Sequence, residues 1–370
     1  MSQDPTAQDD LSQSGGFALP EARALVHDLF KPDPRWFWTD FVLTTALGYG
    51  AAAVYLLNPV FSALGIAGFL VAAFALFRVG TFIHEIVHLR RGTLPGFVAA
   101  WNVVVGIPLM TPSYFYDNHN DHHSRKHYGT PQDGEYMPLA HSPAREIVLY
   151  FAQVPIIPIL AVIRFVVITP LTWVSPKLRR WVDLNASSYI SNPYYRRPAN
   201  TPAPARIWRL AEFGVFAVHA TLLGLLIAGV IPWAMPAKVY VLSCFAILLN
   251  WLRNLAGHSF TSSGAPMSHV AQFEDSITVL GNPVPTELMF PLGLRYHALH
   301  HLFPAMPYHQ LGIAHRRLLA QLSPASRAAY ERTFRPGLLP VLIGLWRSAA
   351  RTGDPAPMRL WRKRQIPAAS

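Results

Sequence analysis

Histidines in this chain fall into four short groups whose spacing suits metal binding. The 370-residue sequence holds sixteen histidines. HEIVH (residues 84–88), HNDHH (119–123) and HALHH (297–301) contain two or three each, and His258 follows Asn254 by four positions in NLAGH. On a helix, residues three or four positions apart share one face, with Cβ atoms about 5–6 Å apart. Each group can therefore direct its imidazoles at one point.

Nine imidazoles exceed the four positions of tetrahedral zinc, but they fit two metals that keep open positions. Imidazole suits iron, and open positions on iron indicate oxygen chemistry. The single cysteine, Cys244, excludes cysteine-based zinc and iron–sulfur sites. The candidate metal ligands are His84, His88, His119, His122, His123, His258, His297, His300 and His301.

Neutral nitrogen ligands leave a metal's charge uncompensated, so we expect carboxylates behind the imidazoles. Four acidic residues near the second group are candidates, and the alternative for each is a solvated loop charge: Asp117, Asp121, Asp133 and Glu135.

The composition indicates a membrane protein. Hydrophobic residues make up 51% and charged residues 14% of the chain, and the mean hydropathy is +0.23. A soluble protein usually has nearer a quarter of its residues charged. The net charge of +11 is then typical of cytoplasmic loops that face lipid, rather than of nucleic-acid binding.

Four apolar runs predict two membrane-spanning helical hairpins. Phe41–Leu57 and Val60–Phe77 are separated by an Asn-Pro turn signal, and Leu210–Trp233 is followed by Val239–Leu252. The first two runs, with 17 and 18 residues, nearly reach the roughly 20 apolar residues that cross a bilayer. Clusters of Lys and Arg lie outside these hairpins, which places both termini in the cytoplasm.

The histidine groups can meet only if all of them lie on one side of the membrane. Gly96–Met110 is therefore expected to be re-entrant or interfacial, and Ile147–Val174 to cross zero or two times. The prolines and Arg164 in the latter stretch favour helices lying on the surface. We predict an all-α integral membrane protein: four transmembrane helices in two hairpins, with a cytoplasmic His-rich catalytic cap and interfacial helices.

The predicted domain organisation has three parts. Residues 1–40 form a polar N-terminal tail and an interfacial approach, residues 41–320 form the membrane catalytic domain, and residues 321–370 form a basic cytoplasmic C-terminal tail.

The order HxxxH, HxxHH, NxxxH and HxxHH around two hairpins resembles the membrane-bound fatty acid desaturase superfamily. The surrounding segments HNDHHSRKHYGTPQDGEY and HALHHLFPAMPYHQL are similar to it too, and the resemblance covers residues 40–320. It implies that the nine histidines bind two iron ions, with O2 as co-substrate, and that Asn254 approaches a metal through water. His127 departs from the family pattern, and we assign it to the surroundings of the metal or to the surface.

The resemblance implies desaturation of a fatty acyl chain. A hydroxylase or ketolase acting on an acyl chain, sphingolipid, alkane or carotenoid is the alternative, because the same boxes serve these reactions. The sequence has no HPGG haem motif, so electrons are expected from a separate ferredoxin, rubredoxin or cytochrome and its reductase. The expected location is the bacterial inner membrane, with the active site cytoplasmic.

Two other classes explain the sequence less well. HEIVH matches the HExxH motif of zinc proteases, with Glu85 as general base, but seven ordered histidines would then have no role. A metal transporter needs polar groups at the membrane midplane, and the spans are nearly bare of them.

The other side chains have ordinary interpretations. His219 lies inside the third span, and we expect it to make a hydrogen bond between helices. Histidines expected at the surface or interface are His27, His141, His269, His309 and His315. Aromatic residues that could line an acyl tunnel, or simply pack, are Trp101, Tyr114, Phe115, Trp251 and Phe260.

Overall fold

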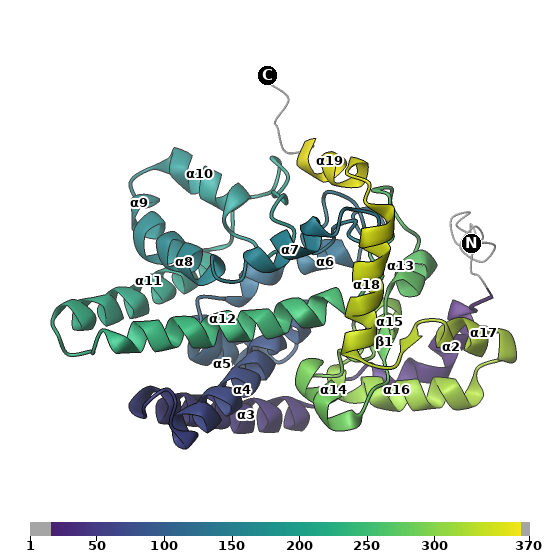
Figure 1. Cartoon of the computed structure of the whole chain (residues 1–370), viewed down its shortest axis with the longest axis horizontal. Coiled ribbons are helices and arrows are strands. Elements are labelled where there is room, and N and C mark those ends of the chain that lie inside the picture. Colours follow the sequence, from purple (N-terminus) through teal and green to yellow (C-terminus); the bar gives the residue numbers. More distant parts are fainter. Residues whose placement is uncertain (1–15, 364–370) are drawn as a thin grey trace. The chain divides into compact units, whose positions relative to one another are not determined.

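A computed structural model describes residues 16–363 and is an all-α membrane protein (Figure 1). The predicted polar tail lies largely outside the described residues. The described chain forms two compact units. Unit 1 comprises residues 16–33, 120–147 and 252–363, and unit 2 comprises residues 34–119 and 148–251.

Both predicted hairpins are confirmed. In unit 2, α3 (Pro34–Leu57) packs against α4 (Ala63–His88). The second pair is α11 (Arg206–Ile227) and α12 (Ala234–Leu255), whose last turn belongs to unit 1. All four helices are long and apolar enough to cross a membrane. Helix α4 continues beyond the apolar run that predicted it and ends at His88, so the HEIVH group is the last part of a spanning helix.

The stretch Gly96–Met110 is helical but short. α5 (Pro95–Trp101) runs into η2 (Asn102–Gly106), which is well below the length that a transmembrane helix needs. After it the chain turns, and the Pro108 carbonyl lies 3.1 Å from Nε2 of His219 on α11. His219 thus contacts the turn after η2 rather than a second helix, and its Nδ1 lies 2.9 Å from the Val215 carbonyl of its own helix.

The stretch Ile147–Val174 is broken by proline. α7 (Arg145–Ala152) is followed at an angle of 45° by a helical run of α8 (Ile157–Val162), η4 (Ile163–Ile168) and α9 (Thr169–Leu171). If the bent pair counts as one span, the described chain has five candidate spans rather than four. Zero or two crossings of this stretch therefore stays a prediction.

Arg164 of η4 is buried inside unit 2 and does not face lipid. Its guanidinium donates to the Glu212 carboxylate of α11. Glu212 also accepts from Arg179, at 2.7 Å, on α10 (Pro176–Asn185). A buried charge needs such partners, since its desolvation costs several kcal/mol. The network links α10 and η4 to α11.

Unit 1 is built from short helices around apolar clusters. Phe17, Phe273, Leu299 and Tyr330 belong to the larger one. Its elements are α2 (Leu19–Val26), η1 (His27–Leu29), α13 (His269–Asp275), α14 (Pro283–Met289), α15 (His297–Leu302), α16 (Tyr308–Gln321), α17 (Pro324–Glu331), α18 (Leu338–Thr352), α19 (Ala356–Lys363) and the parallel pair β1 (Thr278–Val279) and β2 (Phe334–Arg335).

The surface position predicted for His315 is wrong. Its side chain is buried, and Nδ1 lies 2.7 Å from the Tyr330 hydroxyl. Its place in α16 puts it on the same side as Leu311 and Leu318, which pack in the core. The ring is buried because the hydroxyl satisfies its polar nitrogen.

The C-terminal helices pack within unit 1. Trp361 of α19 is fully buried, and its Nε1 donates to the Tyr136 carbonyl at 2.9 Å. Arg362 donates to Glu146 at 2.8 Å, and Ser348 of α18 donates to the Ala140 carbonyl at 3.0 Å. Residues 322–363 thus pack within unit 1 and cover the segment that follows the HNDHH group, and the three-part domain organisation stays a prediction.

Candidate metal centre

Unit 1 brings four of the predicted ligands together. His122 ends α6 (His119–His122), His258 follows α12, and His297 and His301 lie one turn apart on α15. Their ligand atoms all lie within 4.8 Å of one another, and all four rings are buried. The Nε2 atom of His258 is 3.1 Å from that of His122 and 3.0 Å from that of His297. We call these residues the four-histidine group.

A glycine allows the close approach of two parts of this group. A Cβ atom at Gly257 would lie 3.0 Å from Cδ2 of His297. A side chain at this position would push the His297 ring away by a few tenths of an ångström, so glycine favours the close approach of the chain leaving α12 to α15. This contact places His258 beside His297.

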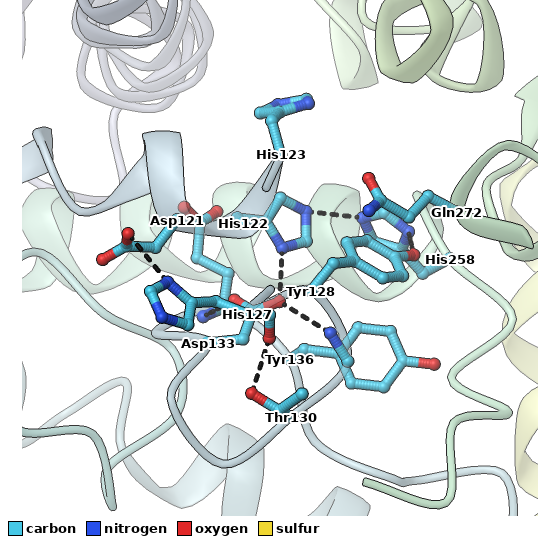
Figure 2. Close-up of polar contacts among 12 residues, drawn as sticks. Asp121, His122, His123, His127, Tyr128, Thr130, Asp133, Tyr136, His258 and Gln272 are labelled. Carbon is cyan, nitrogen blue, oxygen red and sulfur yellow. Dashed lines mark hydrogen bonds and ion pairs between the residues drawn. The ribbon is translucent and has the colours of Figure 1, made fainter. Parts of the chain in front are cut away.

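Asp133 fixes the tautomer of His122 (Figure 2). The Asp133 side chain is fully buried, and its Oδ2 lies 2.9 Å from His122 Nδ1. The same carboxylate accepts from the backbone N–H groups of Gly129, at 3.2 Å, and Glu135, at 2.8 Å. Because a carboxylate only accepts, Nδ1 of His122 carries the proton. Its Nε2 lone pair then faces the group.

His258 is held in the same tautomer through a tyrosine. The Tyr128 hydroxyl lies 2.9 Å from His258 Nδ1 and donates to Asp275 Oδ2 at 2.8 Å. Asp275 also accepts from Tyr136, at 2.9 Å, and from Thr261, at 2.6 Å. With its one proton given to Asp275, Tyr128 can only accept from His258. The Nε2 lone pair of His258 therefore also faces the group.

Two lone pairs about 3 Å apart repel unless a positive charge lies between them. Burial lowers the pKa of His258, His297 and His301 well below its usual value, so these rings are neutral. Burial also disfavours the His122 imidazolium, but Asp133 raises the pKa of His122 overall. Three neutral imidazoles that face His122, whose far nitrogen is backed by a carboxylate, fit a bound cation.

The remaining box histidines form two sets, one in each unit. In unit 2, the ring centroids of His84 and His88 are 5.0 Å apart, and His119 lies 4.6 Å from the first and 5.0 Å from the second. Tyr116 stacks on His119 at 4.6 Å. In unit 1, the Nε2 atoms of His123 and His300 are 3.1 Å apart.

Three other predicted residues pair away from the four-histidine group. Asp121 Oδ1 lies 3.0 Å from Nδ1 of His127, and both side chains are partly exposed. The Asp117 carboxylate accepts from Arg197.

Two further candidates are buried. Glu135 contributes its backbone N–H to Asp133, and its side chain is buried. Asn254 is buried in the last turn of α12.

Sequence reasoning did not identify Tyr128, Tyr136 or Asp275 as site residues. The tyrosines belong to HNDHHSRKHYGTPQDGEY, so a signal was present in the segment after the second group. Asp275 has no such motif around it, and its contact with Tyr128 joins residues 147 positions apart.

Comparisons with known proteins identify the family of this chain. A sequence model of the fatty acid desaturase family, described as "Fatty acid desaturase", matches residues 59–334. A protein named ceramide hydroxylase from Caulobacter vibrioides (strain NA1000 / CB15N) is 33% identical over 328 residues, which cover 88% of this chain and 92% of that protein. No solved structure matches.

Proposed function

The chain belongs to the fatty acid desaturase family, and we propose that it is a di-iron, oxygen-dependent enzyme that hydroxylates a ceramide-like sphingolipid. The observation that carries the substrate and the reaction is the similarity to a ceramide hydroxylase over nearly the full length of both chains. Desaturation of an acyl chain is the second candidate, which the name of the family supports. The family boxes serve both reactions, so the histidines do not choose between them.

The nine box histidines hold two irons in this proposal, as the family resemblance implies. The four-histidine group is one of the two sites, since its buried nitrogen atoms converge. When bound, the irons would activate O2 for attack on an unactivated C–H bond. Asp133 and Tyr128 keep the protons of His122 and His258 on Nδ1, so that Nε2 remains a ligand atom.

The electron donor is proposed to be a separate protein. The chain is basic, with a net charge of +11, and a basic surface attracts an acidic carrier such as a ferredoxin. We place both termini and the active site on the cytoplasmic side of a bacterial inner membrane, where such a carrier is found.

The test is the mass spectrum of lipids from cells that co-express the chain with a ferredoxin and its reductase. Added ceramide should gain one oxygen atom, and His122→Ala should abolish this product while the protein still inserts. Loss of two hydrogens would establish the desaturase instead. Full activity in His122→Ala would exclude the di-iron assignment.

A second pair of variants separates this proposal from an HExxH protease. Glu85 lies at the buried end of α4, with a carboxylate oxygen 3.8 Å from His84 Nδ1. We expect Glu85→Ala to retain part of the lipid-oxidising activity and His84→Ala to retain none. Equal and complete loss, with one bound zinc, would favour the protease.

A further inference from the structure

Exposed apolar side chains of unit 1 are concentrated in one place. Among its described residues, seven large hydrophobic side chains are exposed, and six of them come from two segments. We call these six the apolar face: Leu280, Val284, Leu288, Leu339, Ile343 and Trp346. On the surface of a soluble protein, large exposed hydrophobic residues usually occur singly, whereas a contiguous patch of them marks a binding site.

The two segments lie against each other. A Cβ atom at Gly281, just before α14, would lie 3.0 Å from the Pro336 carbonyl, just before α18. Met289 of α14 and Leu338 of α18 pack on the same small cluster around Phe290. Figure 1 shows α14 beside one end of α18. The two segments that carry these six side chains therefore lie together on the surface of unit 1.

Helix α18 has two kinds of apolar surface. Val341, Leu345 and Ala349 point into unit 1 and are buried. Leu339 and Trp346, which are 66% and 46% exposed, share with Ile343 an outward stripe at spacings of four and three residues. The first set thus packs in the core of unit 1. The outward stripe is exposed and is available to a partner outside unit 1.

Arginines border the outward stripe. Arg347 and Arg351 are exposed on α18, one and two turns from Ile343. A helix with an apolar stripe, a tryptophan and adjacent basic residues is typical of one that lies in the interface of a bilayer. Basic residues near an anionic leaflet each strengthen this association.

We infer that the apolar face of unit 1 docks on the surface of an anionic phospholipid bilayer, with Ile343 and Val284 in the acyl boundary and Arg347 and Arg351 among the headgroups. The charge favours lipid over a second copy of this chain, because two copies would bring these arginines together. The four spans already anchor the chain, so the bilayer is present at high effective concentration. This inference does not depend on the reaction that the enzyme catalyses.

The single native cysteine makes a direct test possible. In a Cys244→Ser background, nitroxide labels are attached at Ile343→Cys, Val284→Cys and, as a control, Arg327→Cys on α17. The Arg327 side chain is 52% exposed, comparable with the apolar face. The full chain is reconstituted in liposomes of zwitterionic and anionic lipid, and label collisions with O2 and with a water-soluble nickel complex are measured by electron paramagnetic resonance.

Labels at positions 343 and 284 should collide with O2 and lose collisions with nickel, whereas the label at 327 should remain open to nickel. Each arginine favours docking by about fivefold. Arg347→Gln with Arg351→Gln should therefore lower the ratio of docked to undocked helix by roughly 25-fold and restore nickel collisions at 343. Equal nickel access at 343, 284 and 327 would overturn the inference. Shielding from both reagents would overturn it too, because a protein would then cover the face.

Discussion

Replacing Asp133 by Asn tests whether a buried carboxylate sets the ligand tautomer of His122. The carboxylate receives three hydrogen bonds and is fully buried. An amide of the same shape can keep the backbone contact from Glu135, but its NH2 group then faces His122 Nδ1. The imidazole proton would be driven to Nε2, the atom that faces the other histidines. Loss of such an outer partner typically lowers metal affinity 10–100-fold, which is about 1.4–2.8 kcal/mol.

The assay is iron content of the purified protein at several concentrations of a competing Fe²⁺ chelator. Asp121→Asn is the matched control, because Asp121 makes the same kind of contact with His127, at 3.0 Å, but outside the four-histidine group. We expect its iron affinity to stay near that of the unmodified protein. If Asp133→Asn binds iron normally, or if both variants lose it equally, the tautomer argument fails.

Three further changes follow from buried contacts. Tyr128→Phe removes the acceptor for His258 and should lower iron affinity roughly tenfold in the same chelator assay; unchanged affinity would contradict this. Glu212→Gln leaves the buried Arg164 without its carboxylate and should destabilise unit 2 by about 3 kcal/mol in detergent unfolding; an unchanged midpoint would refute it. Burial lowers the pKa of His315 to about 4. As the pH falls, His315 is therefore protonated in the unfolded state at a higher pH than in the folded state. The free energy of unfolding should decrease by about 3 kcal/mol between about pH 6.5 and pH 4. His315→Gln should flatten this fall, and an equal pH slope in both proteins would count against it.

The sequence predicted those parts of the structure that depend on local patterns. Apolar runs of sufficient length identified both hairpins, because a helix that crosses the hydrocarbon core of a bilayer needs about 20 consecutive apolar residues. The i, i+4 spacing of His297 and His301 puts both on one side of α15. The end of α4 was underestimated, since hydropathy falls at HEIVH while helical hydrogen bonding continues to His88.

Contacts between distant segments were not predictable in the same way. Tyr128 and Asp275 meet because the loop after HNDHH folds over α13, and neither residue is part of a spacing rule. His315 was assigned to the surface or interface because it belongs to none of the four histidine groups. Its burial depends on the Tyr330 hydroxyl, which a single helix pattern cannot reveal.

In the proposed site, buried carboxylates would offset the charge of a cation that is held by nitrogen ligands alone. Four neutral imidazoles bring no charge, and a divalent ion in a buried site would lose its hydration without an anion to offset it. Asp133 lies one hydrogen bond behind His122, and Asp275 lies behind His258 through Tyr128. Each anion is too far back to bind the ion itself, so it stabilises the positive charge and leaves the ligand positions to nitrogen.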